Sequence, residues 1–153
     1  MKKILINSKT EMAALAKKIA AEAELGDVIA LKGTLGAGKS FFAKNFINFL
    51  LEKEQEILSP TFNLVYSYDT KKGEVFHFDL YRLKNSEELE NIGFFDALKS
   101  GISLIEWPEI AVDFLPKNYL EIEIKIVDGT NEEAREVLLN YIKSDCTISV
   151  RKL

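Results

Sequence analysis

Apolar runs and segments of helical periodicity alternate in the N-terminal part of the chain. Residues 4–6 and 28–31 have the length and composition of buried strands. Between them, Ser8 and Glu11 match the S-x-x-E capping pattern, in which the hydroxyl accepts a hydrogen bond from a first-turn amide and the carboxylate accepts one from the cap amide. The apolar residues that follow have helical spacing, and a second helix is predicted from about 39 to 51. This order of elements is typical of an α/β sheet.

The rest of the chain carries signals of antiparallel strands. Residues 64–68 and 74–78 are rich in aromatic and β-branched side chains and flank a turn at 71–73, which predicts a hairpin. Residues 119–126 alternate between apolar and polar, as a half-exposed strand does. We also expect a helix start at 86–89, an interior strand at 102–105 and, within the ambiguous stretch 131–142, a strand near 135–139. The pattern predicts a single α/β domain over residues 1–153, with a mixed, mostly parallel sheet, antiparallel additions and helices on both faces.

Composition and charge narrow the classes of function. The 153 residues carry 20 lysine and arginine side chains against 24 acidic ones, and the net charge of −4 argues against a protein that coats DNA or RNA by bulk charge. No apolar run approaches the ~20 residues that span a bilayer, and the start of the chain lacks the apolar length of a secretory signal. The single Cys146 excludes an internal disulfide. We expect a cytoplasmic protein that binds neither membrane nor DNA.

Residues 33–40, GTLGAGKS, match the phosphate-binding pattern G-x-x-x-x-G-K-[ST] in full. Glycines let the backbone curl so that successive amides point at phosphate oxygens, and the helix that follows adds its positive pole. Lys39 supplies a mobile charge for the β- and γ-phosphates, and the Ser40 hydroxyl is a ligand for Mg²⁺. A glycine turn that merely joins a strand to a helix is the alternative, but the predicted strand before the loop and helix after it favour a nucleotide site.

Two acidic residues follow predicted strands and are candidates to complete a magnesium site. Asp79 comes after the strand at 74–78, and Glu106 comes after the strand at 102–105. Magnesium that bridges two phosphates leaves positions for water and for a carboxylate, and chemistry in open α/β sheets gathers at the carboxyl ends of strands. Either residue could instead be a solvated loop acid, and for Asp79 the two interpretations are equally good. Glu106 could hold the outer shell of the metal or orient the attacking water, and the sequence does not choose between these roles.

Three further features have both a functional and a structural interpretation. The segment 59–62, SPTF, could hold a hydroxyl that senses the γ-phosphate, although an ordinary proline turn is the better interpretation of this segment alone. His77 is the only histidine, and a lone histidine in a strand is more often a packed, hydrogen-bonded side chain than a base or ligand. Arg82 could act as an internal arginine finger, but a structural ion pair is favoured.

Four motifs together resemble one family. They are GTLGAGKS at 33–40, SPTF at 59–62, HFDLYR at 77–82 and IEWPE at 105–109. In their order and approximate spacing, over nearly the whole chain, they are similar to the bacterial tRNA threonylcarbamoyladenosine biosynthesis ATPases, the TsaE family, formerly YjeE. The resemblance implies a three-layer P-loop NTPase fold. Thr34 stands where the family commonly has Asp or Asn, and Ser40 stands where it commonly has Thr. Ser40 keeps the hydroxyl that a metal needs.

The resemblance also implies a function and partners. Members of the family are small cytoplasmic ATPases that depend on Mg²⁺ and assist a TsaB–TsaD heterodimer. That assembly attaches a threonylcarbamoyl group to N6 of adenosine 37 in tRNA, and ATP binding and hydrolysis drive association with the partners and reset them between turnovers. Contact with tRNA is therefore expected to be indirect, through the partners.

Matched position by position, the resemblance assigns roles to residues of this chain. Residues expected to contact the nucleotide are Thr10, near the adenine, and Gly33, Leu35, Gly36, Ala37, Gly38, Lys39 and Ser40. The expected metal site consists of Ser40, Asp79 and Glu106. Catalytic roles are expected for Lys39, Thr61, Asp79 and Glu106, with Thr61 in the loop that senses the nucleotide.

Two other functions stay open at this point. A small P-loop kinase that phosphorylates a nucleoside or metabolite would need a lid with several arginines, whereas residues 83–101 hold two lysines and no arginine. A regulatory GTP-binding switch with negligible hydrolysis usually carries an N-K-x-D sequence for guanine, and the chain has none. Competition between ATP and GTP, and the identity of the phosphorylated product, distinguish these functions from an ATPase.

Overall fold

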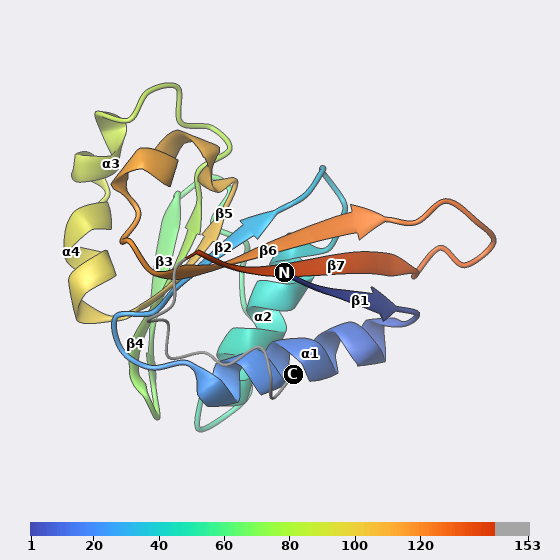
Figure 1. Ribbon diagram of the computed structural model, residues 1–153. Helices are drawn as coiled ribbons and strands as arrows, with labels where there is room; N and C mark the ends of the chain where they lie inside the picture. Colours follow the sequence, from blue (N-terminus) through green and yellow to red (C-terminus); the bar gives the residue numbers. More distant parts are fainter. Residues whose placement is uncertain (143–153) are drawn as a thin grey trace.

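The computed structural model describes residues 1–142, which fold into a seven-stranded sheet with helices on both faces (Figure 1). The strands are β1 (Lys2–Ile6), β2 (Val28–Lys32), β3 (Val65–Thr70), β4 (Gly73–Asp79), β5 (Ile102–Glu106), β6 (Tyr119–Ile126) and β7 (Arg135–Ile142). The helices are α1 (Lys9–Glu22), α2 (Lys39–Leu50), α3 (Glu88–Asn91), α4 (Phe94–Ser100) and the 3-10 helix η1 (Pro108–Phe114). Across the sheet, the strand order is β1-β7-β6-β2-β5-β4-β3.

The centre of the sheet is parallel and its edges are antiparallel. β2 pairs in parallel with β5 on one side and with β6 on the other, and β5 pairs in parallel with β4. β3 runs antiparallel to β4, while β7 runs antiparallel to both β6 and β1. The predicted mixed sheet with antiparallel additions is therefore confirmed, but the sheet is not mostly parallel, because three of its six strand pairings within residues 1–142 are antiparallel. Because β2, β4 and β5 run in the same direction, the residues at their carboxyl ends meet at one edge.

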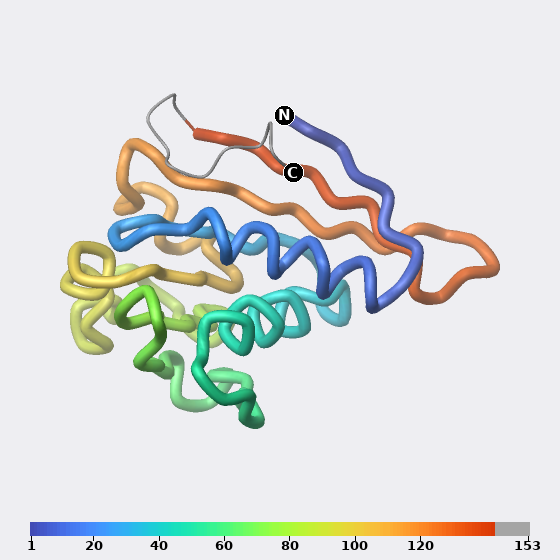
Figure 2. The backbone as a smooth tube through the Cα atoms, turned by 90° about the horizontal axis from the view of Figure 1, so that it is seen from below, coloured from blue at the N-terminus to red at the C-terminus, as the bar shows by residue number. Residues whose placement is uncertain are grey.

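Helices α1 and α2 lie side by side on one face of the sheet and enclose the larger part of the core (Figure 2). Phe42 and Phe46 of α2 are fully buried, as are the strand residues Ile29 and Leu104 in the same cluster. Burial of aromatic side chains of this size contributes much of the free energy of folding. The core therefore fixes α2, and with it the loop that precedes α2, against the parallel centre of the sheet.

The start of α1 follows the predicted capping pattern with one difference. Ser8 Oγ accepts a hydrogen bond from the Glu11 amide at 3.1 Å, which satisfies a first-turn donor of the helix. The Glu11 carboxylate accepts from the Asn7 amide at 2.7 Å, and not from the Ser8 amide as expected. The carboxylate thus stabilises the residue before the cap, where the chain turns from β1 into α1.

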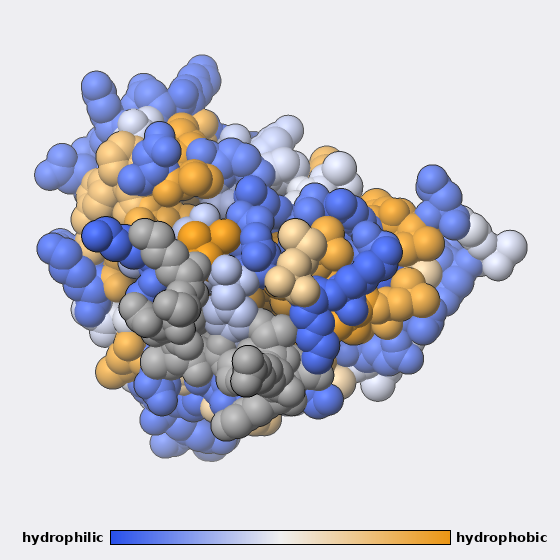
Figure 3. Space-filling model, in the orientation of Figure 1, coloured by the Kyte–Doolittle hydropathy of each residue, from blue (hydrophilic) through white to orange (hydrophobic). Residues whose placement is uncertain are grey.

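On the other face, α3, α4 and η1 cover the half of the sheet that contains β2, β5 and β4. There Phe78 and Phe94 make an edge-to-face ring contact with centroids 5.1 Å apart. The same face of β1 and β7 carries Leu5, which is 56% exposed, and the ion pair between Lys3 and Glu136. Figure 3 shows apolar and hydrophilic side chains mixed over this end of the molecule. On this face of the sheet, the helices are therefore confined to the half beside the loop at 33–40.

Several predicted elements have different boundaries in the structure. The helix expected from 86–89 is the four-residue α3, because Gly93, with a φ of 71°, separates it from α4. The ambiguous stretch 131–142 forms the strand β7 from Arg135 onward. Residues 1–142 contain no helix that is long and apolar enough to cross a membrane. Cys146 lies outside the described residues.

Gly101 joins α4 to β5 where the backbone of β4 passes closely. A Cβ atom at this position would lie 2.5 Å from the Glu74 carbonyl oxygen and 2.7 Å from the Phe76 ring. We expect Gly101→Ala to lower the free energy of unfolding by about 1–3 kcal/mol, because the backbone must shift to relieve the overlap. Urea denaturation measures the effect, with the exposed neighbour Ser100→Ala as a control that should change stability by less than about 0.5 kcal/mol. Wild-type stability of Gly101→Ala would contradict this close packing.

Candidate functional site

The loop at 33–40 connects β2 to α2 and has the backbone of a phosphate-binding turn. Gly38 has a φ of 116°, in the left-handed region that favours glycine, and it is the N-cap of α2 without a capping side chain. Gly33 approaches β6 so closely that a Cβ atom would lie 2.5 Å from the Ile124 carbonyl oxygen. The first-turn amides of α2 are therefore left for an external acceptor, which is the arrangement that binds anions at helix N-termini.

Lys39 is 4% exposed and folds back onto this loop. Its Nζ donates to two carbonyl oxygens of the loop, at 2.7 and 2.9 Å, and lies 4.1 Å from the centroid of the Trp107 ring. Burial lowers the pKa of Lys39, and the neighbouring carboxylates of Glu106 and Asp79 oppose that shift. The Lys39 ammonium is therefore hydrogen-bonded to the loop, at the position where the sequence motif places a cation for phosphate.

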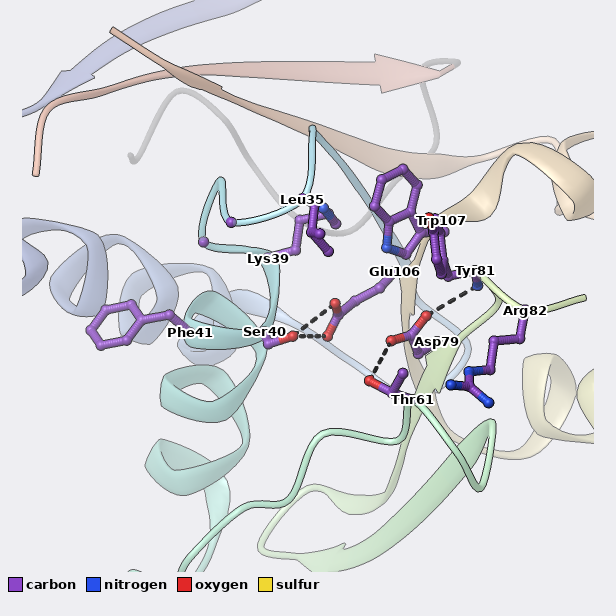
Figure 4. Close-up of a pocket in the computed structure, with 12 residues that line it drawn as sticks. Leu35, Lys39, Ser40, Phe41, Thr61, Asp79, Tyr81, Arg82, Glu106 and Trp107 are labelled. Carbon is purple, nitrogen blue, oxygen red and sulfur yellow. Dashed lines mark hydrogen bonds between the residues drawn. The ribbon is translucent and has the colours of Figure 1, made fainter. Parts of the chain in front are cut away.

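Asp79 and Glu106 lie side by side at the ends of β4 and β5, because the strand register pairs these two residues. They are 5% and 2% exposed, respectively. Ser40 Oγ lies 3.0 and 2.9 Å from the two Glu106 carboxylate oxygens (Figure 4). Asp79 accepts hydrogen bonds of 3.1 Å from Thr61 Oγ1 and from the Tyr81 amide. The structure thus brings four of the residues proposed from sequence, two hydroxyls and two acids, into one site.

These groups line a cavity of 320 Å³. Its lining consists of Leu35, Gly36, Gly38, Lys39, Ser40, Phe41, Thr61, Asp79, Tyr81, Arg82, Glu106 and Trp107. In Figure 4, Lys39, Ser40 and Glu106 converge from the loop and β5, while the Phe41 ring points away from the acids. Backbone amides, one ammonium and two carboxylates therefore face the same space.

A second cavity, of 280 Å³, shares Gly36, Gly38 and Phe41 with the first. It is also lined by Ser8, Lys9, Met12, Ala37, Glu132, Glu133 and Arg135. Arg135 Nε donates to the Ala37 carbonyl oxygen at 2.8 Å and so ties β7 to the loop. Thr10, which was expected near an adenine, is exposed and lines neither cavity, although its neighbours at the start of α1 line this one.

The oxygen donors of the first cavity suit a hard cation such as Mg²⁺. The Ser40 hydroxyl and the carboxylates of Asp79 and Glu106 are the ligand types that this ion prefers. Within residues 1–142, no group of three or more His, Cys, Asp or Glu side chains could hold a metal ion on its own. Magnesium at this place would therefore need phosphate oxygens and water to complete its octahedral shell, as it does when it is bound together with a nucleotide.

Trp107 forms an aromatic wall of the cavity. Its φ of 55° is left-handed, which is uncommon for a bulky residue and tends to occur at functional sites. The ring lies over Lys39 and packs against Tyr81, with ring centroids 4.7 Å apart. Pro108 follows and begins η1. The structure places its ring between the loop lysine and the surface residue Tyr81.

Two more residues contact the site, and the first of them, His77, is a packed, hydrogen-bonded strand side chain as the sequence predicts. His77 is fully buried, and its Nε2 lies 2.7 Å from Glu106 Oε1. The prediction of a structural ion pair for Arg82 is wrong, because Arg82 has no ion-pair partner among residues 1–142. Its guanidinium lies 4.2 Å from the centroid of the Phe62 ring and lines the cavity. The HFDLYR motif did contain a signal for His77, because residues two apart on a strand share a face and His77 precedes Asp79 by two.

Comparison with known proteins gives consistent matches. The family model "Threonylcarbamoyl adenosine biosynthesis protein TsaE" matches residues 6–137. The tRNA threonylcarbamoyladenosine biosynthesis protein TsaE of Rickettsia prowazekii is 41% identical over 124 residues, which cover 81% of this chain and 86% of the relative. The protein of the same name from Bacillus subtilis is 37% identical over 133 residues, with coverage of 86% and 80%. The crystal structure of YdiB from Bacillus subtilis superposes with a TM-score of 0.72 at 30% identity and covers 93% of this chain and 86% of that one.

Trp107 is the only tryptophan of the chain and lies on the cavity wall, so its emission should report what enters the cavity. We expect saturating ATP with Mg²⁺ to change the intrinsic fluorescence, because phosphate draws the Lys39 ammonium away from the indole ring. The Trp107→Phe variant is the control and should lose the signal while still binding ATP in equilibrium dialysis. An unchanged Trp107 spectrum at an ATP concentration that dialysis shows to be saturating would contradict this geometry.

Proposed function

We propose, starting from the fact that this chain belongs to the TsaE family of threonylcarbamoyl adenosine biosynthesis proteins, that it is a Mg²⁺-dependent ATPase of that pathway. In this proposal the protein works in the cytoplasm and supports the N6-threonylcarbamoyladenosine modification at position 37 of tRNA. It does so through nucleotide-dependent association with a TsaB–TsaD heterodimer. The observation that carries the proposal is the convergence of Lys39, Ser40, Asp79 and Glu106 on one cavity beside the uncapped N-terminus of α2.

The loop and α2 would hold the triphosphate. The amides at the N-terminus of α2 and the Lys39 ammonium supply positive charge where phosphate oxygens accumulate negative charge. Ser40 and the two carboxylates would hold Mg²⁺ together with the phosphates, and the ion, when bound, neutralises charge on the phosphoryl group. Glu106 contacts the Ser40 hydroxyl directly, which supports a place for Glu106 on the metal side of the nucleotide.

Thr61 would connect the nucleotide to the 59–62 segment. Its hydroxyl donates to Asp79 Oδ2 at 3.1 Å and lies 3.1 Å from the Ser59 hydroxyl. A γ-phosphate or metal that engages Asp79 would therefore also act on this segment. Order and relaxation of a loop with the γ-phosphate is the usual way in which P-loop proteins signal their nucleotide state.

The rim of the cavity has the properties of a protein-binding surface. Three large apolar or aromatic side chains lie in or beside the nucleotide cavity and are well exposed: Leu35 at 78%, Phe62 at 77% and Tyr81 at 58%. Exposed apolar groups gathered at a functional pocket are typical of interaction sites. Their position supports a partner that senses whether the cavity is filled, and the net charge of −4 supports contact with tRNA through that partner.

Phosphate release from ATP, measured with and without the purified TsaB–TsaD pair, tests the proposed function. We expect slow turnover by the isolated chain and faster turnover with the partners, both of which stop when EDTA removes Mg²⁺. We also expect ATP to displace a bound fluorescent nucleotide better than GTP does. A phosphorylated small molecule as product would favour the kinase alternative, and failure to bind ATP, or turnover that ignores the partners, would overturn the proposal.

Substitution of Lys39 tests the phosphate contact by itself. We expect Lys39→Ala to weaken ATP binding by about 1.5–3 kcal/mol, because a charge-assisted contact to phosphate is lost. Isothermal titration calorimetry measures the change. Lys44→Ala, on the same helix but away from the cavity lining, removes the same charge and should bind ATP as the wild type does. Equal losses in the two variants would show that the effect comes from net charge and not from the loop.

A further inference from the structure

His77 touches the site described above, although no role has been assigned to it. Its side chain is 0% exposed, and Nε2 lies 2.7 Å from Glu106 Oε1. The pairing of β4 with β5 sets His77 opposite Leu104, two residues before Glu106, and on the same face of β4 as Asp79. The bond therefore runs between neighbouring strands, from the core side of the sheet toward the acid that faces the cavity.

Glu106 depends on this bond, because a buried carboxylate is unfavourable unless it is hydrogen-bonded. Within residues 1–142, its two side-chain partners are Ser40 and His77. Ser40 lies on the nucleotide side of Glu106, at the first turn of α2, and its oxygen is the one that the motif directs to a metal. His77 is fully buried and does not line the cavity, so a ligand in the cavity would meet Glu106 and not His77.

The surroundings of the other ring nitrogen, Nδ1, indicate that the hydrogen bond to Glu106 is the reason for a histidine at position 77. Within residues 1–142, Nδ1 is buried and has no hydrogen-bond partner. A buried polar atom without a partner carries a free-energy cost that an apolar side chain of similar size would avoid. A histidine is thus a poor choice for packing alone at this position, and its one favourable polar contact is the bond from Nε2 to the carboxylate.

We propose that His77 is a positioning residue that fixes the Glu106 carboxylate when Ser40 engages magnesium-bound nucleotide. This inference rests on the proposed function. A cation held by a lone pair of the Ser40 oxygen would leave the hydroxyl proton free to donate to Glu106, and the His77 contact, enclosed between strands, would hold the same carboxylate. With Oε1 bonded to His77 Nε2, the carboxylate would keep one orientation toward the cavity. Partners of this kind orient the groups around a metal and tune its binding.

Two substitutions of His77 separate its hydrogen bond from its volume. His77→Gln places an amide nitrogen where Nε2 lies and can still donate to Glu106, whereas His77→Leu fills the space without a donor. The readouts are phosphate release and the gain in ATP affinity that Mg²⁺ produces, the latter followed through Trp107 emission with and without EDTA. We expect His77→Leu to lose about tenfold or more in turnover and in the Mg²⁺-dependent gain, and His77→Gln to recover most of both.

A double-mutant cycle with Glu106→Gln tests whether His77 acts through Glu106. We expect His77→Leu to cause no further loss in a Glu106→Gln background, because the carboxylate that it positions is already gone. A residue that only supports the fold would cause the same fold-loss in both backgrounds. Should His77→Leu fail to fold, His77→Asn takes its place in both backgrounds, because its shorter amide brings no donor to the position of Nε2.

Ser103→Ala is the matched control. Ser103 is fully buried on β5, and within residues 1–142 its Oγ has no hydrogen-bond partner, but it points to the opposite face of the sheet. This variant should match the wild type in every readout.

Folded His77 variants with wild-type Mg²⁺ dependence and turnover, or an equal loss in both backgrounds, would overturn the positioning role alone. A wild-type protein that neither binds ATP nor releases phosphate with its partners would overturn the proposed function, and this inference with it.

Discussion

The parallel pairing of β2, β5 and β4 is the constraint on which the site depends. Its register sets Leu31 on one side of Glu106 and Asp79 on the other, although the three residues are far apart in sequence. Side chains alternate between the two faces of a strand, so a slip of one residue in the pairing would turn a carboxylate away from the cavity. Ile102 and Leu104 alternate with the same period into the core under α2. Hydrophobic packing therefore fixes the carboxylates to the side where the loop at 33–40 supplies its amides.

The site concentrates charge in a region that the fold removes from water. One ammonium, on Lys39, and two carboxylates, on Asp79 and Glu106, are each at most 5% exposed. Desolvation of such groups is unfavourable, and the hydrogen bonds to Ser40, His77 and the loop carbonyl oxygens offset only part of that cost. A site of this kind is one that a fold retains for chemistry and not for stability.

Features encoded by a contiguous stretch of sequence could be predicted. Features that depend on the direction of a side chain, or on the backbone conformation of one residue, could not. The phosphate-binding loop is a contiguous motif, and Asp79 and Glu106 each follow an apolar run, so their convergence followed from the parallel sheet alone. The contact of Arg82 with Phe62 could not be foreseen, because both side chains leave irregular segments whose paths the sequence does not specify. The break between α3 and α4 depends on the backbone conformation of Gly93, which a helical pattern alone does not reveal.

Trp107 joins the buried charge of the site to the exposed rim. It follows Glu106 directly, and its left-handed backbone turns the indole ring back over Lys39 and against Tyr81, which is 58% exposed. The Asp79 carboxylate accepts from the Tyr81 amide, so the same acid pair that lines the cavity also holds the residue that the ring packs against. Lys39 is thus connected to the exposed Tyr81 through the Trp107 ring, and Tyr81 is connected to Asp79 by a hydrogen bond from its amide to the carboxylate.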